Sequence, residues 1–313
     1  MTNLFFPERN VFYNIVGLTM DTDFFLNQLF NGLSLASIYF MIAIGLSLSF
    51  GYMRIINMAH GEFLMLGGYI SYIVQQSNIF PEAVFPLFSI FFSFIVLFIF
   101  GLVFWYLILK RVQNTLDTIL LTWGLSLILQ QLVRDAFGPT GVGVVPPKWL
   151  STTLYLGGVY IPVVRIYIIV VMLFVLLLLY LLFFKTDLGL NLRAVAQDRE
   201  TASAMGINDD LVNLLIFALG SGIAGAGGSA LSMVSSITPT TGMSYIVDAF
   251  LVVIFGGVGS LGGTLLGSII IGFMSAIFSG YMEVSLAKAL VLMSVILFIQ
   301  FRPTGLISVK IRG

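Results

Sequence analysis

The chain has no cysteine, a single histidine and few charged residues. Without cysteine it forms no disulfide, and one histidine alone argues against a conventional zinc site, so we expect no metal. Lys and Arg together number 14, as do Asp and Glu, which excludes the basic footprint of a nucleic-acid-binding protein. No Gly-Lys-Ser/Thr phosphate loop occurs. We therefore expect no cofactor in this chain and no ATP hydrolysis through that device.

The scarcity of charge extends over long stretches. Only 9% of the 313 residues are charged, whereas a soluble domain carries about 25%, so lipid must be the solvent of most of the surface. No Asp, Glu, Lys or Arg occurs in the runs 24–53, 63–81, 83–109, 166–184, 211–247 and 249–282.

These runs are near-continuous and do not alternate as barrel strands do, and a spanning helix needs about 20 apolar residues. We expect an all-α fold, a polytopic transmembrane helical bundle of about nine segments that include broken helices. The whole chain, 1–313, is expected to be one transmembrane domain. The expected segments are 26–50, 62–78, 84–109, 115–133, 161–184, 211–234, 244–258, 263–281 and 285–301.

The distribution of Lys and Arg predicts an orientation, because short cytoplasmic loops are rich in these residues. The N-terminal segment 1–23 is then extracytoplasmic, without the features of a signal peptide, and the C-terminus is cytoplasmic. The residues assigned to the cytoplasmic side are Arg54, Lys110, Arg111, Lys185, Arg193, Arg199, Arg302, Lys310 and Arg312. Those assigned to the outer side are Arg9, Arg134, Lys148 and Arg165, while Lys288 falls inside the last segment.

Two glycine-rich breaks interrupt the apolar segments, at Gly51–Gly68 and at Gly256–Gly263. Glycine clusters at membrane depth indicate broken helices or close helix contacts, and paired breaks point to the pathway of a transporter. We expect Gly256, Gly257 and Gly259 to form a gate or broken helix. The pattern Gly257-x-Gly259-x-x-Gly262 lacks the strand-turn-helix context of a dinucleotide site.

Polar residues at membrane depth are candidates for a translocation path. In the first break, Asn57 is expected to cap a helix that carries His60 and Glu62 in its first turn. Asp248 has no charged neighbour in the sequence; it is either functional or held in the first turn of a helix that starts near Ser244. The candidate path residues are Asn57, His60, Glu62, Thr122, Trp123, Gln130 and Asp248.

The segment 185–210 is a polar island between two apolar runs. It mixes basic and acidic residues and predicts a short helix over Ala194–Met205, which would lie on the membrane surface or insert into a partner.

Several motifs together resemble the permease family of ATP-driven importers for branched-chain amino acids and urea. They are Ile56–Phe63 (INMAHGEF), Arg193–Glu200 (RAVAQDRE) with Met205–Ile207, and Phe255–Thr264 (FGGVGSLGGT). Within that family the chain looks most like the urea and short-chain amide branch. The features that carry this are Thr122–Gln131 (TWGLSLILQQ), Arg134–Pro139, Tyr245–Phe250 (YIVDAF) and Gln300–Leu306.

The resemblance implies a complex in a bacterial inner membrane. A second permease subunit would pair with this chain as a heterodimer, an extracytoplasmic binding protein would deliver substrate, and two cytoplasmic ATPase subunits would bind ATP. The segment 185–210 would then be the coupling loop. The residues expected to couple to the ATPases are Arg193, Gln197, Asp198, Glu200, Met205 and Gly206.

The chemistry of the substrate favours urea, because a small neutral molecule needs hydrogen-bonding groups, whereas a zwitterionic amino acid would call for paired charges or helix ends. The alternative within the family is a branched-chain amino acid permease. A more distant alternative is an autonomous secondary carrier or channel, which the scarcity of intramembrane carboxylates disfavours. An enzyme acting through His60 and Glu62 would need a nucleophile and a third group.

Overall fold

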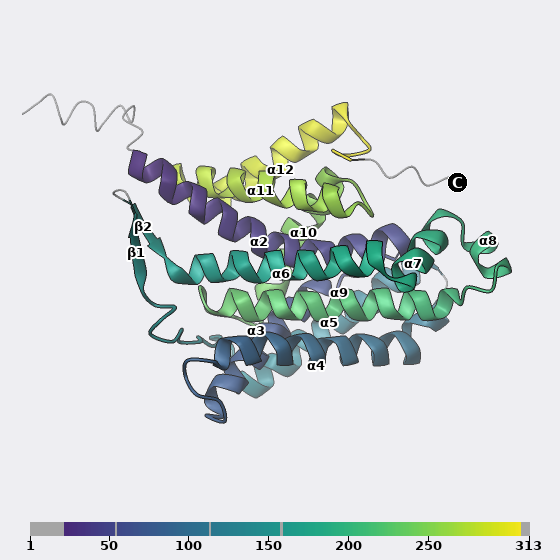
Figure 1. Ribbon diagram of the computed structural model, residues 1–313, viewed down its shortest axis with the longest axis horizontal. Coiled ribbons are helices and arrows are strands. Elements are labelled where there is room, and N and C mark those ends of the chain that lie inside the picture. Colours follow the sequence, from purple (N-terminus) through teal and green to yellow (C-terminus); the bar gives the residue numbers. More distant parts are fainter. Residues whose placement is uncertain (1–21, 54, 113, 157–158, 308–313) are drawn as a thin grey trace, which may run out of the picture.

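The computed structural model describes residues 22–53, 55–112, 114–156 and 159–307. Long helices run side by side through the described part (Figure 1), which confirms the predicted polytopic helical bundle. The longer helices are α2 (Thr22–Met53), α3 (His60–Gln76), α4 (Phe85–Leu107), α5 (Thr115–Phe137), α6 (Val163–Lys185), α9 (Asp209–Ser232), α10 (Thr241–Gly256), α11 (Leu261–Tyr281) and α12 (Val284–Phe301). The shorter elements are η1 (Leu109–Arg111), α7 (Asp187–Gln197), α8 (Arg199–Ala204), β1 (Thr153–Leu156) and β2 (Val159–Pro162).

Each predicted segment coincides with one helix, and seven helices of the described chain are long and apolar enough to cross a membrane. The other two, α3 and α10, have 17 and 16 residues, fewer than the roughly 20 that a full crossing requires. These two short helices therefore mark the places where the regular spanning pattern is broken.

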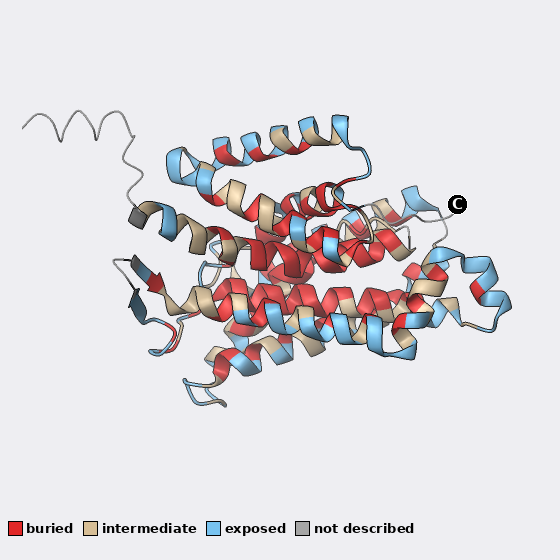
Figure 2. Ribbon diagram, turned by 45° about the horizontal axis from the view of Figure 1, so that its top comes forward, coloured by how far each residue is buried: buried red, intermediate tan, exposed pale blue. Residues whose placement is uncertain are grey.

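Helices α2 and α9 form the centre of the bundle and are buried along most of their length (Figure 2). Their glycines permit backbone contact with neighbouring helices. A Cβ atom on Gly228 of α9 would lie 1.7 Å from the Leu64 carbonyl oxygen, and one on Gly67 of α3 would lie 2.0 Å from the Gly225 carbonyl oxygen. Because lipid provides no hydrophobic force between helices, such close packing is a main source of bundle stability.

A two-stranded hairpin precedes α6, where the sequence predicts that a membrane segment has already begun at residue 161. Strands β1 and β2 pair antiparallel, with Thr153 opposite Pro162 and Tyr155 opposite Tyr160. Pro162 has extended backbone angles and stands directly before the helix, where a missing amide proton costs no helical hydrogen bond. The segment expected at about 161–184 therefore coincides with α6, whose first helical residue is Val163.

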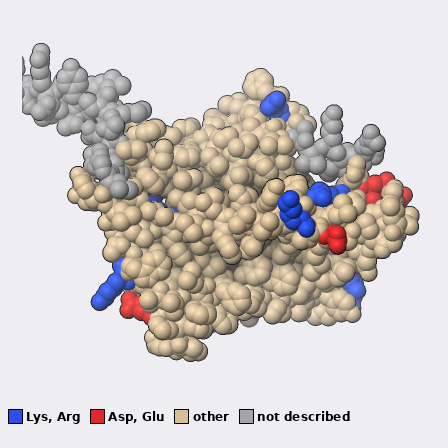
Figure 3. Space-filling model, viewed as in Figure 1, with Lys and Arg blue, Asp and Glu red and all other residues tan. Residues whose placement is uncertain are grey.

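The two ends of the bundle differ. Helices α7 and α8 and the last described turn lie at one end, and the β1–β2 hairpin lies at the other (Figure 1). On the face drawn in Figure 3, charged side chains gather toward the two ends and leave a broad uncharged band between them. The predicted extracytoplasmic segment up to residue 21, and Arg54, Lys310 and Arg312, lie outside the described residues.

Candidate functional site

Helix α3 begins inside the bundle, not at its end. The Asn57 side-chain oxygen accepts a hydrogen bond of 3.0 Å from the Ala59 amide, and its carbonyl accepts one of 3.3 Å from the His60 amide. Ala59, not Asn57, is the N-cap residue, so the expectation that Asn57 caps the helix is wrong. Asn57 instead shapes the turn two residues before the cap. The Met58 amide donates to the Thr122 hydroxyl at 3.1 Å, which ties this turn to α5.

His60 is fully buried against the middle of α2. Its Nε2 atom lies 2.9 Å from the Ile42 carbonyl oxygen, and its ring lies so close to Gly45 that a Cβ there would be 2.7 Å from Cε1. The imidazole therefore fastens the start of α3 to the central helix. Among the described residues no group of histidines, aspartates and glutamates is arranged to hold a metal, and His60 has the geometry of a structural contact.

Glu62 is the centre of a buried polar cluster between α3 and α5. Its Oε1 atom accepts hydrogen bonds from the Ser126 hydroxyl at 3.0 Å and from the Gln130 amide at 2.9 Å. The Gln130 amide also donates to the Ser126 hydroxyl at 3.2 Å. Its Oε2 atom has no hydrogen-bond partner and lies beside Gly242, where a Cβ would be 2.5 Å away. One oxygen is thus satisfied, and the other faces the start of α10.

Of the predicted path residues, Glu62 and Gln130 meet in this cluster. Asn57 and Thr122 contact the turn before α3, whereas His60 contacts α2. Ser126 belongs to the same cluster, and sequence reasoning missed it. Thr122, Ser126 and Gln130 recur every four residues, a spacing that places them on one face of a helix, and this regularity was the available signal. Trp123 does not join them, because it lies on the outer face of α5 and is 48% exposed.

Asp248 lies apart from the cluster and forms an ion pair. The Lys288 ammonium of α12 lies 2.9 Å from Asp248 Oδ2 and also donates to the Ser244 carbonyl oxygen at 3.3 Å. Helix α10 begins at Thr241, so Asp248 is two turns into the helix. Of the two alternatives for Asp248, the one that placed it in the first turn of a helix is therefore wrong. Its charge partner is 40 residues away in the sequence, which is why the sequence shows none.

The predicted gate glycines form a tight turn between α10 and α11. Gly257 and Gly259 adopt positive φ angles of 105° and 76°, which only glycine reaches without strain. The Gly259 amide donates to the Ser47 hydroxyl of α2 at 3.2 Å, and the Ile307 amide donates to the Gly256 carbonyl oxygen at 3.0 Å. The turn is therefore held by both the central helix and the last described residues.

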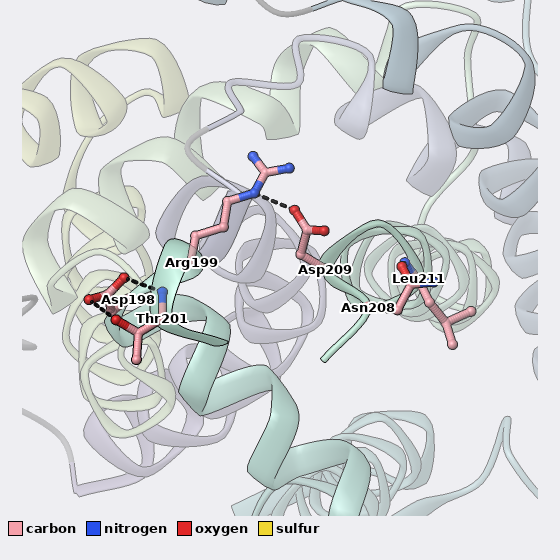
Figure 4. Close-up of polar contacts among 6 residues, drawn as sticks. All are labelled: Asp198, Arg199, Thr201, Asn208, Asp209 and Leu211. Atoms are coloured by element: carbon pink, nitrogen blue, oxygen red, sulfur yellow. Dashed lines mark hydrogen bonds and ion pairs between the residues drawn. The ribbon is translucent and has the colours of Figure 1, made fainter. Parts of the chain in front are cut away.

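The polar island contains two helices where the sequence predicts one. Asp198 has an extended backbone, which ends α7, and its carboxylate caps α8 by accepting from the Thr201 amide at 3.0 Å and the Thr201 hydroxyl at 2.7 Å (Figure 4). These hydrogen bonds, the backbone one foremost, lower the pKa of Asp198. Figure 4 also shows the Arg199–Asp209 ion pair, which links α8 to α9 at 2.5 Å.

The predicted coupling residues divide between two surfaces. Glu200, Met205 and Gly206 are exposed on α8 and the turn after it, Met205 at 79%. Arg193 and Gln197 of α7 instead line a groove of about 350 Å³. This groove also touches Gly259–Gly262 of the gate turn and Gly51 and Tyr52 of α2. The Arg193 guanidinium donates to the Phe183 carbonyl oxygen at the end of α6.

Comparison with known proteins gives consistent matches. The family described as branched-chain amino acid transport system / permease component matches residues 28–300. The high-affinity branched-chain amino acid transport system permease protein BraD of Pseudomonas aeruginosa is 29% identical over 300 residues, covering 91% of this chain and 96% of that protein. LivH of Escherichia coli, with the same description, is 28% identical over 297 residues with the same coverage.

A shorter match extends to a protein with another substrate. The ribose import permease protein RbsC of Haemophilus influenzae is 32% identical over 124 residues, which are 36% of this chain and 38% of that protein. No solved structure matches the chain.

Proposed function

Because the chain belongs to the family of branched-chain amino acid transport system permease components, we propose that it is a membrane-spanning subunit of an ATP-driven importer for branched-chain amino acids. With seven long apolar helices, it is a multi-pass inner-membrane protein. As a permease component it is a transport subunit and not itself an enzyme. The observation that carries the proposal is the match to BraD and LivH along nearly the whole length of both chains.

The proposed substrate replaces urea, which the sequence alone favours. None of the relatives named above is described as a urea permease. The chemical reason for urea is also weakened, because it depended on the absence of paired charges at membrane depth. Asp248 and Lys288 supply such a pair. The short match to a ribose permease shows that similar permease sequences are named for different substrates, so transport assays must identify the substrate.

The proposed complex contains this chain, a second permease subunit, two ATPase subunits and an extracytoplasmic binding protein. ATP would bind to the ATPase subunits, because this chain has no phosphate-binding loop. The cluster around Glu62 would lie beside the translocation path, and membrane lipid would surround the outer faces. Trp123 faces away from that cluster, so it would reach a path only where one lies between two permease subunits.

Helix α8 with Met205 and Gly206 is the proposed contact with an ATPase. Its exposed side chains project from the end of the bundle, and the Arg199–Asp209 pair fixes it to α9. Movement of α7 and α8 would reach the gate turn through the groove that Arg193, Gln197 and Gly259 share. This gives a physical route from ATP hydrolysis to the turn that joins α10 and α11.

Reconstitution of the complete complex in proteoliposomes tests the substrate. We expect ATP-dependent uptake of labelled leucine that excess unlabelled isoleucine suppresses and excess urea does not. ATP-dependent uptake of urea without leucine would retain the importer and overturn the amino acid assignment. Leucine uptake by this chain alone without ATP would overturn the importer mechanism.

Charge reversal tests the ATPase contact. Glu200→Lys on α8 is expected to lower leucine uptake and release the ATPase subunits during purification, while the chain still inserts in the membrane. The control is Glu82→Lys, which makes the same change at an exposed position near the opposite end. Equal retention of ATPase subunits by both variants would remove α8 from the proposed interface.

A further inference from the structure

The ion pair Asp248–Lys288 joins α10 to α12, and no other pair of described membrane helices is joined by an ion pair. Only two ion pairs occur among the described residues, and the other one, Arg199–Asp209, lies in the polar island. The Asp248 side chain is 7% exposed, whereas the Lys288 side chain is 44% exposed. One charge is thus held inside the bundle while its partner remains accessible.

A half-exposed ammonium on a membrane helix is not expected to face hydrocarbon. Lys288 is the fifth residue of α12, and α12 ends at the end of the bundle that carries α7 and α8 (Figure 1). Lys288 therefore lies toward the hairpin end, which the Lys and Arg distribution predicts to be extracytoplasmic. A solute arriving from outside would meet Lys288 first and Asp248 behind it.

The surroundings of the pair suit a small amphipathic molecule. The Tyr245 ring lies 5.8 Å from the Lys288 ammonium and meets the Tyr39 ring edge to face, with centroids 6.2 Å apart. Met243 and Val247 are exposed on α10, one turn apart. They are the sequence neighbours of Ser244 and Asp248, the two residues of α10 that Lys288 contacts. Two opposite charges thus stand beside aromatic rings and an exposed aliphatic strip.

We propose that Asp248 and Lys288 form a zwitterion-recognising site, in which Lys288 binds the α-carboxylate of the substrate and Asp248 its α-ammonium group. The aliphatic side chain of the substrate would lie along Met243 and Val247. The direct ion pair closes the site when it is empty and is replaced by two substrate contacts when it is filled. This inference rests on the proposed function and names the part of the chain that handles an amino acid.

Recognition of a zwitterion would also explain why the protein keeps two charges at this depth. A charge pair in a membrane helix generally costs more free energy than apolar packing of the same volume, so its presence points to a specific purpose. A tie between α10 and α12 is the competing purpose, and the two make different predictions. A tie needs only opposite charges, whereas recognition also needs each charge at its own position relative to the aliphatic strip.

The test uses the complete reconstituted complex with leucine-loaded binding protein in excess, and measures leucine transported per ATP hydrolysed. Lys288→Met and Asp248→Asn are each expected to lower this ratio about tenfold or more, as for loss of a charged hydrogen bond, with the ATPase subunits retained. Glu283→Gln is the control, since it removes a charge next to the start of the same helix without touching the pair.

A charge-exchanged variant, Asp248→Lys combined with Lys288→Asp, separates recognition from a structural tie. We expect it to restore thermal stability but not leucine transport per ATP, because the substrate would have to bind reversed. Transport at the wild-type ratio by this variant, or by both single variants, would overturn the zwitterion site alone. No leucine transport by the wild-type complex would overturn the proposed function, and the zwitterion site with it.

Discussion

Single polar atoms govern the interior of this bundle, because no water is available to replace a lost hydrogen bond. Glu62 illustrates the constraint. Its Oε1 atom receives two hydrogen bonds, from Ser126 and Gln130, while its Oε2 atom is buried without a partner. The cluster therefore tolerates little further loss, since each removed donor leaves a larger part of the carboxyl group unsatisfied.

Two adjacent glutamines of α5 provide a matched test of this reasoning. Gln130→Leu removes a buried donor to Glu62 and is expected to cost about 1–3 kcal/mol of stability. Gln131→Leu removes an exposed hydrogen bond to Asp135 and is expected to cost less than about 0.5 kcal/mol. The measurement is the fraction of protein that stays monodisperse after heating in detergent. Equal losses would show that the Glu62 cluster contributes nothing special.

At this scale the sequence predicts what is local and misses what is distant. The first-turn position of Glu62 follows from neighbouring residues, because a helix start depends on residue types within a few positions, although the cap itself is Ala59 and not Asn57. The hydrogen bond between Glu62 and Gln130 connects residues 68 positions apart in the sequence, and the Asp248–Lys288 ion pair connects residues 40 positions apart. Such contacts depend on which helices pack together, and the local patterns of a single sequence do not reveal this packing.

Helix contact at glycine is the corresponding constraint for whole elements, and the chain offers a matched pair of positions. Gly228→Ala would place a Cβ 1.7 Å from the Leu64 carbonyl oxygen, so α3 and α9 must separate. We expect a loss of about 1–3 kcal/mol or more. Gly124→Ala on α5 meets no atom within 4 Å and is expected to be neutral or to stabilise by up to about 1 kcal/mol.

The readout for the two glycine variants is the same thermal challenge in detergent, together with the yield of inserted protein. A Gly228→Ala variant as stable as the wild type would contradict the close contact between α3 and α9. A destabilised Gly124→Ala variant would indicate that the outer face of α5 packs against another subunit in the membrane.

Helix α8 is held by a titratable cap, so its order is expected to depend on pH. The lowered pKa of Asp198 means that the folded cap favours the carboxylate form. Its stabilisation is present above the ordinary aspartate pKa, about 3.9, and is lost as pH falls through the lowered folded value. Protection of the Thr201 amide from hydrogen exchange, corrected for the intrinsic rate, should therefore fall in acid below about pH 4.

The control for this pH prediction is the neighbouring cap of α9. Asn208 accepts a hydrogen bond of 3.0 Å from the Leu211 amide, with the same geometry but without a titratable group. Protection of the Leu211 amide is expected to stay constant while that of Thr201 falls. Parallel loss at both amides would mean that acid unfolds the whole island, and the Asp198 cap would not be the cause.

The elements themselves were predictable to within a few residues, because charged residues stand at several helix ends and a glycine-rich break separates α10 from α11. Lys110 and Lys185 mark the ends of α4 with η1 and of α6. The hairpin at Thr153–Pro162 was missed, since its Tyr, Val and Ile residues suit both a strand and an apolar span. The break at Asp198 was missed as well, because an N-cap within a run of good helix formers shows no change in periodicity.

Over the whole molecule, the distribution of Lys and Arg predicts the orientation of the bundle in the membrane. The described Lys and Arg residues assigned to the cytoplasm lie at the ends of α4, α6 and α12 and on α7 and α8, on the side opposite the hairpin (Figure 1). The positive-inside rule relates this asymmetry to the membrane potential and the insertion machinery. If the rule holds here, the zwitterion site opens outward and the groove beside Arg193 opens inward.

The natural absence of cysteine makes the orientation directly measurable. Tyr155→Cys lies in the hairpin and Met205→Cys after α8, at exposures of 63% and 79%. With the chain expressed without its ATPases, a membrane-impermeant maleimide applied from outside should label residue 155 in cells with a sealed inner membrane. Residue 205 should react only after that membrane is permeabilised. The reverse pattern would invert the bundle, move Lys288 to the cytoplasmic side and remove the basis for both proposed sites.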